Sequence, residues 1–572
     1  MNVLGITHGI DSAAALTRGG EIAAAVTDER YTGRKHSRDF PARSIDFCLR
    51  QAGVTLPELD AVAFFWNPGV HLESFDPRRS QVRHHGELLA SLPNHLIAMY
   101  PRRWQDLRVA HVEQRFLLEG VERPLALHYV SHHVAHAASC FFPSEFEEAA
   151  ILTVDGYGER TSAFLGRGRG SRIERLREIE FPHSLGAFYA AMTQYLGFLP
   201  NCDEGKLMGL AAHGEPRYAK PLREIVRITP DGGLEVDLSY FAYHQERPRR
   251  YARKLLDLLG ADRRPDDPIE DRHKDVAASA QLVLEEVLVS MARRLRSETG
   301  LSRLVLAGGV ALNCVANTRV IEEGGFDDAF IQPAAGDNGA ALGAALYVTH
   351  QLGDVPRSGG PYTDFLGPCF AEGEIEGELR DAGLRYERSP DVASACAERL
   401  AHGEILGWFQ GRMEFGPRAL GGRSILADPR DPGVKQRLDA TIKRREAFRP
   451  YAPAVLEEAH SRFFSGPGTS PFMLKSYQVR PDARAAIPAV VHVDGSARVQ
   501  TVDEGRNPLL YDLIRRFEER TRVPVVLNTS FNGRGETMVA TVRDALRCFF
   551  TTGLDSLALG PFLLSKPGRR GE

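Results

Sequence analysis

The sequence predicts a protein of the α/β class with two large domains, and three features carry this prediction. Apolar runs at 3–7 and 149–154 read as buried strands, and each leads into an acidic or glycine-rich turn and a returning strand. Residues 275–298 repeat apolar side chains at helical spacing. The glycine- and proline-rich stretch 353–361 is the best linker in the chain, and a second α/β pattern follows it.

Further elements can be placed in order along the chain. A helix at 41–51 begins with proline and ends before Gly53. The glycine turn at 336–339 opens a helix of small residues at 340–347. We therefore expect domains at 1–355 and 369–572, joined by a linker at 356–368. The remaining strands are expected at 13–17, 22–27, 161–166, 303–307, 403–410 and 523–527.

Composition excludes several classes of protein. The chain has 572 residues and a net charge of −4, which argues against a general binder of nucleic acid or membrane surfaces. No run of 18 apolar residues predicts a transmembrane helix, and the N-terminus does not resemble a signal peptide. The 7 cysteines are widely spaced without a CxxC pair, so we expect a protein of the reducing cytoplasm.

A histidine pair at the start of a predicted helix is the first candidate site. His132 and His136 lie one helical turn apart and can chelate a transition metal, with His133 and His136 as a competing pair. The best-placed carboxylate partners are Asp155 and Asp337, both in glycine turns at strand ends. Such a set suits Fe(II), Mn(II) or Zn(II) better than Mg(II), because imidazole is a borderline ligand.

Glycine turns form the second candidate site, one for a nucleotide. The turn at 155–158 and the turn from Gly308 through Gly309 to Asn313 each follow a strand. Glycine lets the backbone approach a phosphate or ribose closely. The chain has neither a P-loop nor a convincing dinucleotide fingerprint. Lys206 stands between glycines at 204–214, and for it a packing role and a ligand role weigh equally.

Arginines gather in the predicted second domain, in the bend at 414–424 and around 443–450. Converging arginines on a near-neutral protein predict a polyanion site, because arginine binds phosphate and carboxylate bidentately. A solvated basic face explains Arg444 and Arg445 equally well. The candidate ligand-binding residues are Arg418, Arg423, Ser424, Lys443, Arg449, Arg498, Asn528 and Ser530.

Together these segments resemble one family, the O-carbamoyltransferases that modify antibiotics and Nod factors. HHVAHAAS, VDGYGE, GKLMGLAAHG and GGVALN are similar to its N-terminal domain, and EFGPRALGGRSIL, FRPYAP, ARVQTV and VLNTSFN to its C-terminal domain. The matches run from residue 3 to residue 532 and cover both domains. The resemblance implies an actin/Hsp70-like nucleotide-binding domain followed by a YrdC-like domain.

The resemblance also implies a two-stage reaction. Carbamoyl phosphate and ATP, the latter with Mg(II), give carbamoyl adenylate in the second domain. A small-molecule hydroxyl on a sugar, cyclitol or nucleoside then takes the carbamoyl group in the first domain, and AMP leaves. Fe(II) or a similar ion would be held by His132, His136, Asp155 and Asp337. Lys35, Lys206, Gly156, Gly308, Gly309 and Asn313 would hold the nucleotide part.

The catalytic residues implied by the resemblance are Lys443 and Arg418 for adenylate formation and His8 or Asp11 at the acceptor hydroxyl. The family has a histidine where this chain has Ile10, and His8 shares a strand face with that position. A strand-end histidine with no role is equally compatible with the sequence. A homodimer is expected only by analogy.

Two alternative functions are weighed against this one. Carbamoylation of a non-hydroxyl acceptor occurs in tRNA modification and hydrogenase maturation, but the hydrogenase type carries an acylphosphatase module and CxxC zinc motifs that are absent here. An actin-fold ATP-binding protein without transferase activity would need no second, arginine-rich domain.

Overall fold

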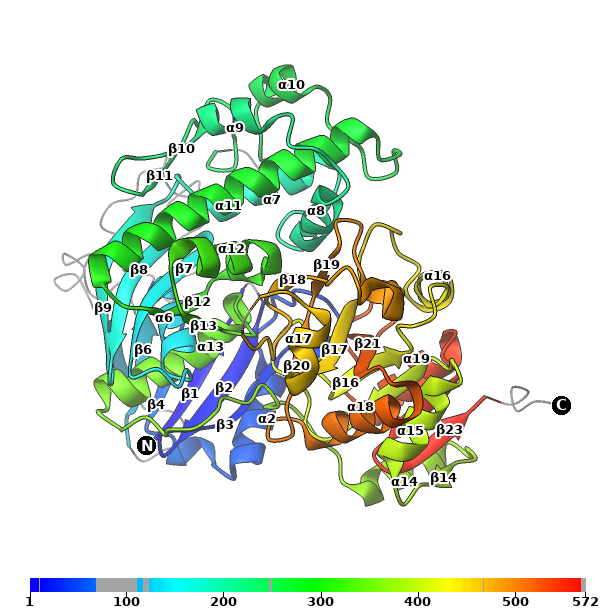
Figure 1. The fold of residues 1–572 in the computed structure, drawn as a ribbon. Helices are drawn as coiled ribbons and strands as arrows, with labels where there is room; N and C mark the ends of the chain where they lie inside the picture. The colour runs from blue at the N-terminus through cyan, green and yellow to red at the C-terminus, as the bar shows by residue number, and fades with distance from the viewer. Residues whose placement is uncertain (10, 68–110, 117–122, 246–248, 467, 567–572) are drawn as a thin grey trace. The chain divides into compact units, whose positions relative to one another are not determined.

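The computed structural model describes the chain except for residues 10, 68–110, 117–122, 246–248, 467 and 567–572 (Figure 1). Two compact units emerge from it. The first contains Met1–Thr27 and Arg38–Tyr362, and the second contains Asp28–Ser37 and Thr363–Glu572. The second unit is therefore discontinuous in sequence, because it takes up a short segment that carries α1 (Glu29–Thr32) and Lys35.

The first unit begins with a six-stranded sheet in the order β3-β2-β1-β4-β6-β5. β1 pairs antiparallel with β2 and parallel with β4, and β4 pairs parallel with β6. Helix α2 packs on β2 and β3. The elements are β1 (Asn2–Thr7), β2 (Ala13–Arg18), β3 (Glu21–Thr27), α2 (Ala42–Ala52), β4 (Ala61–Phe64), β5 (His111–Phe116) and β6 (Leu125–Val130).

A second sheet of the same unit has five strands in the order β13-β12-β7-β8-β9. β7 pairs antiparallel with β8 and parallel with β12, so it occupies the position that β1 has in the first sheet. The two segments that look alike in sequence thus form the first antiparallel strand pair of two similar sheets. The strands are β7 (Glu148–Gly158), β8 (Thr161–Arg169), β9 (Arg172–Glu180), β12 (Arg303–Ala307) and β13 (Asp328–Ile331).

This duplicated order, an antiparallel β-meander continued by parallel strands, confirms the α/β class and the actin/Hsp70-like organisation of the first domain. Helices α6 (His132–Phe141) and α13 (Asp337–Leu346) pack against each other, α6 also on β7 and α13 also on β1 (Figure 1). Glycines permit this close approach, because a Cβ on Gly343 would overlap the Ala135 carbonyl and a Cβ on Gly5 that of Ala341. The start of each helix is thereby held near the end of β7.

The other elements of the first unit lie around the second sheet. α11 (Asp271–Thr299), the long green helix in Figure 1, confirms the predicted amphipathic helix and packs on α8, α9 and α12. No helix among the described residues is long and apolar enough to cross a membrane. The remaining elements are α7 (Leu185–Tyr195), α8 (Glu204–Ala211), α9 (Ala219–Ile225), β10 (Val226–Ile228), β11 (Leu234–Val236), α10 (Arg253–Leu259) and α12 (Cys314–Gly324).

The second unit is built on an eight-stranded sheet in the order β14-β23-β22-β15-β16-β21-β17-β20. Its α/β class agrees with the prediction for this part of the chain. The strands of this sheet are β14 (Glu387–Arg388), β15 (Leu406–Phe409), β16 (Arg423–Ala427), β17 (Ala452–Leu456), β20 (Gln500–Val502), β21 (Val525–Ser530), β22 (Ser556–Leu559) and β23 (Phe562–Ser565). β18 (Ser476–Gln478) and β19 (Ser496–Arg498) pair in a separate two-stranded sheet.

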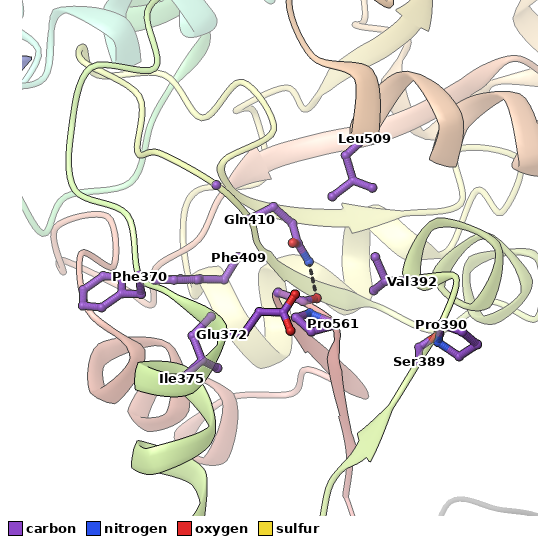
Figure 2. Close-up of a pocket in the computed structure, with 12 residues that line it drawn as sticks. Phe370, Glu372, Ile375, Ser389, Pro390, Val392, Phe409, Gln410, Leu509 and Pro561 are labelled. Carbon is purple, nitrogen blue, oxygen red and sulfur yellow. Dashed lines mark hydrogen bonds between the residues drawn. The ribbon is translucent and has the colours of Figure 1, made fainter. Parts of the chain in front are cut away.

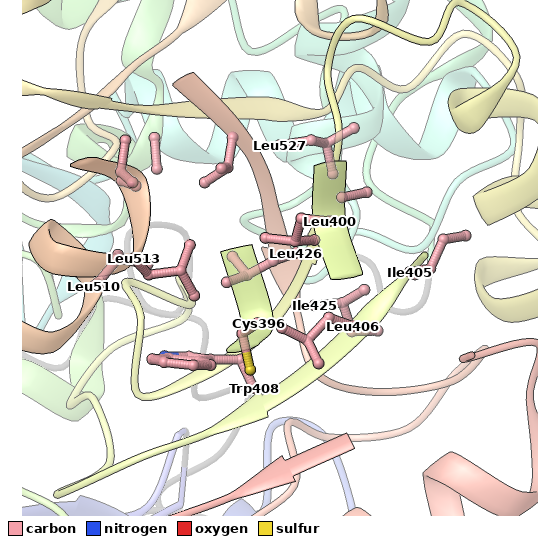
Figure 3. Packing of buried hydrophobic residues seen from close by; sticks show 14 of the residues in the cluster. Cys396, Leu400, Ile405, Leu406, Trp408, Ile425, Leu426, Leu510, Leu513 and Leu527 are labelled. Atoms are coloured by element: carbon pink, nitrogen blue, oxygen red, sulfur yellow. The ribbon is translucent and has the colours of Figure 1, made fainter. Parts of the chain in front are cut away.

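Helices of the second unit close a large apolar core over this sheet. Cys396 and Leu400 of α15 and Leu510 and Leu513 of α18 lie over strand residues that include Trp408, all of them buried (Figure 3). The helices are α14 (Glu372–Asp381), α15 (Val392–Ala401), α16 (Val434–Leu438), α17 (His460–Phe463), α18 (Pro508–Thr521) and α19 (Val542–Thr551).

One local expectation is wrong. Residues 155–158 are not a turn, because β7 continues through them to Gly158. The ladder runs from Val154 opposite Ala163 to Gly158 opposite Thr161, so residues 155–157 bulge out against the single residue Ser162. A bulge redirects side chains at the end of a strand, and Asp155 lies within it.

The stretch expected to be a linker is held down at one point. The Arg357 guanidinium donates to the carbonyls of Phe141, Phe142, Ser144 and Phe146 and lies over the Phe141 ring. These contacts fasten residues around 357 to the end of α6, within the first unit.

Candidate metal centre and anion-binding residues

Four predicted metal ligands converge in the first unit. His132 and His136 come from the first two turns of α6, Asp155 from the bulge of β7, and Asp337 from the first residue of α13. Their ligand atoms all lie within 4.8 Å of one another, and both imidazoles are completely buried. We call these four residues the His2Asp2 cluster.

The spacing of the donor atoms fits a transition-metal ion. His136 Nε2 lies 3.0 Å from both His132 Nε2 and Asp155 Oδ2. Asp337 Oδ1 is 3.6 Å from His132 Nε2 and 3.5 Å from His136 Nε2. With metal–ligand bonds of about 2.1 Å, neighbouring ligands of an octahedral or tetrahedral ion lie roughly 3.0–3.4 Å apart. Two imidazoles and two carboxylates therefore present a donor set suited to Fe(II), Mn(II) or Zn(II).

Electrostatics within the cluster show how strongly its groups interact. Burial by itself lowers the pKa of His136, but the carboxylates of Asp155 and Asp337 outweigh it and raise that pKa to about 9. Burial raises the pKa of Asp155, yet hydrogen bonds to His132 and His136 hold it well below its usual range. The pKa of Asp337 is raised by burial and by the Asp155 charge. A cation that draws on both carboxylates would relieve their repulsion.

His133 belongs to a different set of contacts. Its Nδ1 lies 2.7 Å from Thr153 Oγ1 and its Nε2 3.0 Å from the Thr161 carbonyl, so both ring nitrogens bind β7 and β8 residues. The Nε2 atoms of His132 and His136 converge, whereas that of His133 does not. The alternative ligand pair of His133 with His136 is therefore not formed.

Two neighbours that the sequence reasoning missed shape the cluster. A Cβ on Gly158 would overlap the His132 ring, so only glycine lets β7 come this close. The Glu159 carboxylate accepts hydrogen bonds from the backbone N–H of His132 (3.0 Å) and of Asn67 (2.7 Å). Burial raises the pKa of Glu159 to about 8. A glutamate directly after a glycine-rich strand end carries no distinctive signal, because its partners lie far away in sequence.

The second glycine turn lies directly beside Asp155. Gly308 (φ 88°) packs against the Val154 backbone, where a Cβ would clash. A Cβ on Gly309 would come within 3.0 Å of Asp155 Oδ1. The Gly156 N–H donates to Asp155 Oδ1 at 2.6 Å. The structure therefore brings Gly156, Gly308 and Gly309 together next to the His2Asp2 cluster.

Asn313 ends this turn, and its side chain is fully engaged within the protein. It caps α12 by accepting from the Ala316 N–H (3.0 Å), and it exchanges hydrogen bonds with Gln281 of α11. Gln281 also accepts from the Tyr189 hydroxyl. Asn313 thus anchors the turn through its side chain, and the predicted ribose or adenine contact remains a prediction.

The residues expected at the acceptor lie at the end of β1. The Asp11 carboxylate is 4.0 Å from the place of a Cβ on Gly336, the residue before Asp337. Asp11 has a φ of 44°, a conformation that turns the chain sharply. His8 is exposed and meets the Phe40 ring edge-on at 5.8 Å. Ile10, where the family has a histidine, lies outside the described residues.

Lys206 is placed on α8 rather than in a loop. Its ammonium pairs with Asp203 at 3.1 Å and lies 5.6 Å from the centre of the Phe198 ring. These partners are not members of the His2Asp2 cluster, so a role at the nucleotide phosphate remains a prediction.

In the second unit, Glu414 organises the arginine-rich bend. Its Oε1 accepts hydrogen bonds from the N–H groups of Leu420 (2.7 Å), Gly422 (2.6 Å) and Arg423 (3.1 Å). A buried carboxylate that accepts three backbone hydrogen bonds holds the bend in one conformation. Arg418 lies inside this bend, and the sequence reasoning singled out the arginine but not the glutamate that shapes its setting.

Arg423 stabilises the bend through the contacts of its side chain. Its side chain is completely buried, its guanidinium lies 3.6 Å from the Phe409 ring centre, and it donates to the carbonyls of Pro368 and Gln410 at 2.9 Å each. Burial lowers its pKa to about 10. These contacts bind Arg423 to the protein, and a direct substrate contact remains a prediction.

The buried side chain of Lys443 reaches the end of β21. Its ammonium donates to the Ser530 carbonyl (2.5 Å), the Asn532 carbonyl (3.1 Å) and Asn532 Oδ1 (2.7 Å). Burial, together with the charge of Arg445, lowers the pKa of Lys443 well below its usual range. Arg449 and Lys35 lower it further, which places two more predicted residues close by. Lys35 thus lies near Lys443 and Arg449, other positively charged residues of the second unit.

Three predicted polar residues line up on two paired strands. Ser424 of β16 stands directly opposite Ser530 of β21, so their side chains share a face. Asn528 lies two residues before Ser530 and donates to the Ala419 carbonyl (3.2 Å) and to Gln500 Oε1 (2.8 Å). Within the described part of the chain its buried Oδ1 has no hydrogen-bond partner, which suits a donor on a ligand. Arg498 lies on β19, paired with Ser476.

A cavity of about 290 Å³ opens elsewhere in the second unit (Figure 2). Apolar side chains that include Phe370, Val392 and Leu509 form most of its wall, and Gln410 donates to the Gly560 carbonyl at 2.9 Å on one side. Among the described residues, none of the predicted anion-binding side chains lines this cavity.

Comparisons with known proteins identify the family of the chain. Residues 2–346 match the family described as Carbamoyltransferase N-terminus, and residues 397–566 match Carbamoyltransferase C-terminus. The chain is 41% identical to the uncharacterised protein sll1178 of Synechocystis, over 99% of this chain and 97% of that one. It is 40% identical to nodulation protein NolNO of Sinorhizobium fredii, over 97% and 79% of the two chains.

A relative named for its reaction is also similar. The 3'-hydroxymethylcephem-O-carbamoyltransferase of Streptomyces clavuligerus is 34% identical over 60% of this chain and 61% of that one. Since one family description covers residues 2–346, more than half of the sequence, the chain is a member of the carbamoyltransferase family and an enzyme of that class.

Proposed function

We propose that this carbamoyltransferase uses ATP and carbamoyl phosphate to carbamoylate a hydroxyl group of a small molecule through carbamoyl adenylate. The observation that carries the proposal is the convergence of the His2Asp2 cluster with the glycines 156, 308 and 309 at the end of β7. This arrangement supports a cation site beside a turn that can receive a nucleotide phosphate.

The first stage belongs to the second unit. Water cleaves carbamoyl phosphate to carbamate and inorganic phosphate. A carbamate oxygen then attacks the α-phosphorus of ATP, so that carbamoyl adenylate forms and pyrophosphate leaves. The polyanionic reactants need cations, and Arg418, Lys443, Arg449 and Lys35 supply them. The ordered bend around Glu414 and the fixed Lys443 limit the reorganisation needed when these charges bind.

The second stage belongs to the first unit. The acceptor oxygen attacks the carbamoyl carbon, its proton passes to a base, and the bond from that carbon to the AMP oxygen breaks. When bound by the His2Asp2 cluster, a divalent ion would supply Lewis-acid stabilisation of the charge that develops on the departing phosphate. Gly156, next to which the described residues leave open space, has room for that phosphate, and Asp11, close to Gly336, can take the acceptor proton.

The acceptor is proposed to be a small hydroxyl compound such as a sugar, cyclitol or nucleoside. The cephem O-carbamoyltransferase, whose name specifies transfer to oxygen, supports a hydroxyl acceptor. The family match supports the transferred group.

The proposal is tested with the full chain, ATP and radiolabelled carbamoyl phosphate. Pyrophosphate should appear without an acceptor, and AMP together with a labelled carbamate ester should appear only when a hydroxyl acceptor is added. If neither pyrophosphate nor AMP forms with any member of an acceptor panel, the proposed reaction is wrong.

A further inference from the structure

Aromatic rings stand against the His2Asp2 cluster. Trp66, two residues after β4, meets the His132 ring at 5.4 Å between centroids and 66° between planes. Trp66 also meets Tyr157 of the β7 bulge at 6.0 Å and 90°. The two rings therefore form a right-angled corner that adjoins a predicted metal ligand. Both are partly exposed, whereas His132 is completely buried.

Buried groups hold this corner in place. The rings of Phe65 and Phe181, each 2% exposed, lie behind Trp66 (6.0 Å) and Tyr157 (5.2 Å) respectively. The Glu159 carboxylate binds the N–H of Asn67, next to Trp66, and the N–H of His132. The segment that carries Trp66 is thus tied to the first turn of α6. Such backing keeps the entropy lost on ligand binding small.

The corner joins two kinds of surface. Trp66 and Tyr157 offer aromatic faces and edges, while His132 and Asp155 beside them are polar and ionisable. A flat apolar ligand would offer no polar group to the partly exposed Asp155 carboxylate, and a flexible polyol would lose more entropy than a ring on binding. A saturated ring with C–H faces and a rim of hydroxyl groups satisfies both surfaces.

We propose that Trp66 and Tyr157 form the subsite that binds the ring of the acceptor, a pyranose or a cyclitol, and directs one of its hydroxyls to the cluster. This inference rests on the proposed function and specifies its substrate class. Binding energy from the unreactive part of a substrate serves to orient the reacting group. Trp66 and Tyr157 are accordingly residues that select the acceptor, not residues that perform the chemistry.

A direct binding measurement tests the subsite independently of catalysis. The chain has 3 tryptophans, so Trp66→Phe isolates the fluorescence of Trp66 by difference. Titration of the wild-type chain with methyl β-glucopyranoside or myo-inositol should quench this signal saturably. Sorbitol, an acyclic polyol, should bind about tenfold more weakly or worse. Equal quenching by sorbitol, or quenching by AMP but not by the ring compounds, would overturn the assignment.

Kinetics give a second, separable readout. Trp66→Leu and Tyr157→Leu should each raise KM for a ring acceptor about tenfold, with kcat within about threefold and pyrophosphate formation unchanged. Phe550→Leu is the matched control, because Phe550 is a 49% exposed aromatic on α19 of the other unit. An unchanged KM in both variants refutes the subsite. If no acceptor is carbamoylated at all, the proposed function fails, and the fluorescence titration still decides whether the corner binds rings.

Discussion

His136 Nε2 lies 3.0 Å from Asp155 Oδ2, and the two side chains come from consecutive elements of the chain, α6 and β7, that also pack against each other. One comes from the second turn of α6 and the other from a bulge at the end of β7. The bulge matters here, since a bulge redirects the side chains at the end of a strand. The His2Asp2 cluster is therefore a product of the packing of α6 on β7.

Removing one imidazole from the cluster should weaken metal binding. In His136→Ala only three of the four ligands remain, and we expect at least a tenfold loss in affinity for Fe(II) or Zn(II). Metal content after dialysis, measured by inductively coupled plasma mass spectrometry, checks this. His8→Ala is the control and should keep its metal, because exposed His8 lies outside the cluster. Equal metal content in His136→Ala and the wild type would contradict the assignment.

A pair of glycine variants tests the approach of β7 to His132. Gly158→Ala should displace the His132 ring, because the added methyl group would overlap it, and metal affinity should fall at least about tenfold. Gly156→Ala should keep its metal, since apart from its chain neighbours no atom of the described residues lies within 4 Å of the place of its Cβ. Isothermal titration with Zn(II) compares the two. If both alanines behave alike, the steric argument is wrong.

Two lysine variants should separate the two stages. Lys443→Ala leaves the oxygens of Ser530 and Asn532 without their donor and should lower pyrophosphate formation by about a hundredfold or more. Lys206→Ala should instead lower transfer to the acceptor while pyrophosphate formation continues. Lys220→Ala, an exposed position on α9, is the control for both assays. Pyrophosphate formation at the wild-type rate in Lys443→Ala would remove Lys443 from the first stage.

Acceptor activation is tested at the end of β1. If His8 or Asp11 contacts the acceptor hydroxyl, His8→Ala or Asp11→Asn should slow carbamoyl transfer by about a hundredfold, the usual contribution of a general base. Pyrophosphate formation should not change, because these residues belong to the other unit. Single-turnover transfer from preformed adenylate is the measurement. Normal transfer rates in both variants would show that neither residue serves the acceptor.

Asp364 should make the second unit less stable as pH rises. Burial and the nearby Glu414 charge raise its pKa to about 8, from 3.8 for an ordinary aspartate. The folded state therefore favours the protonated acid, and its contribution to stability is present below pH 3.8 and lost as pH rises through 8. Asp364→Asn, which stays neutral, should remove this loss.

Urea midpoints at pH 5 and pH 8.5, followed by the fluorescence of buried Trp408, measure the effect. The wild-type midpoint should fall between these pH values more than that of Asp364→Asn. Asp482→Asn, whose side chain is 74% exposed, should follow the wild type. Parallel pH profiles for all three proteins would contradict the raised pKa of Asp364.

Much of the architecture could be predicted from local sequence patterns. Apolar runs predicted β1, β7 and β12, and helical spacing predicted α11. Both predictions were possible because a buried strand or a buried helix face requires a characteristic pattern of apolar side chains. The i,i+4 spacing of His132 and His136 placed both rings on one face of α6 in the same way. A family resemblance extended these patterns to the whole chain.

Other features depend on contacts between residues far apart in sequence. The roles of Glu159 and Glu414, which bind backbone N–H groups, follow from chain segments that only the fold brings near them. The segment of Lys35 joins the second unit although the neighbouring residues on both sides belong to the first. The local sequence around a single residue does not predict such long-range contacts.

The sequence by itself determined the α/β class, the duplicated strand openings, the helix that carries His132 and His136, and the family. The tertiary structure alone decided that His133 turns away to Thr153, that residues 155–158 continue a strand as a bulge, and that Trp66 lies against His132. The physical reason is the sequence distance over which the interactions act. Periodicity and propensity act over a few residues, whereas a metal site or an acceptor corner requires groups that meet only when sheets and helices pack.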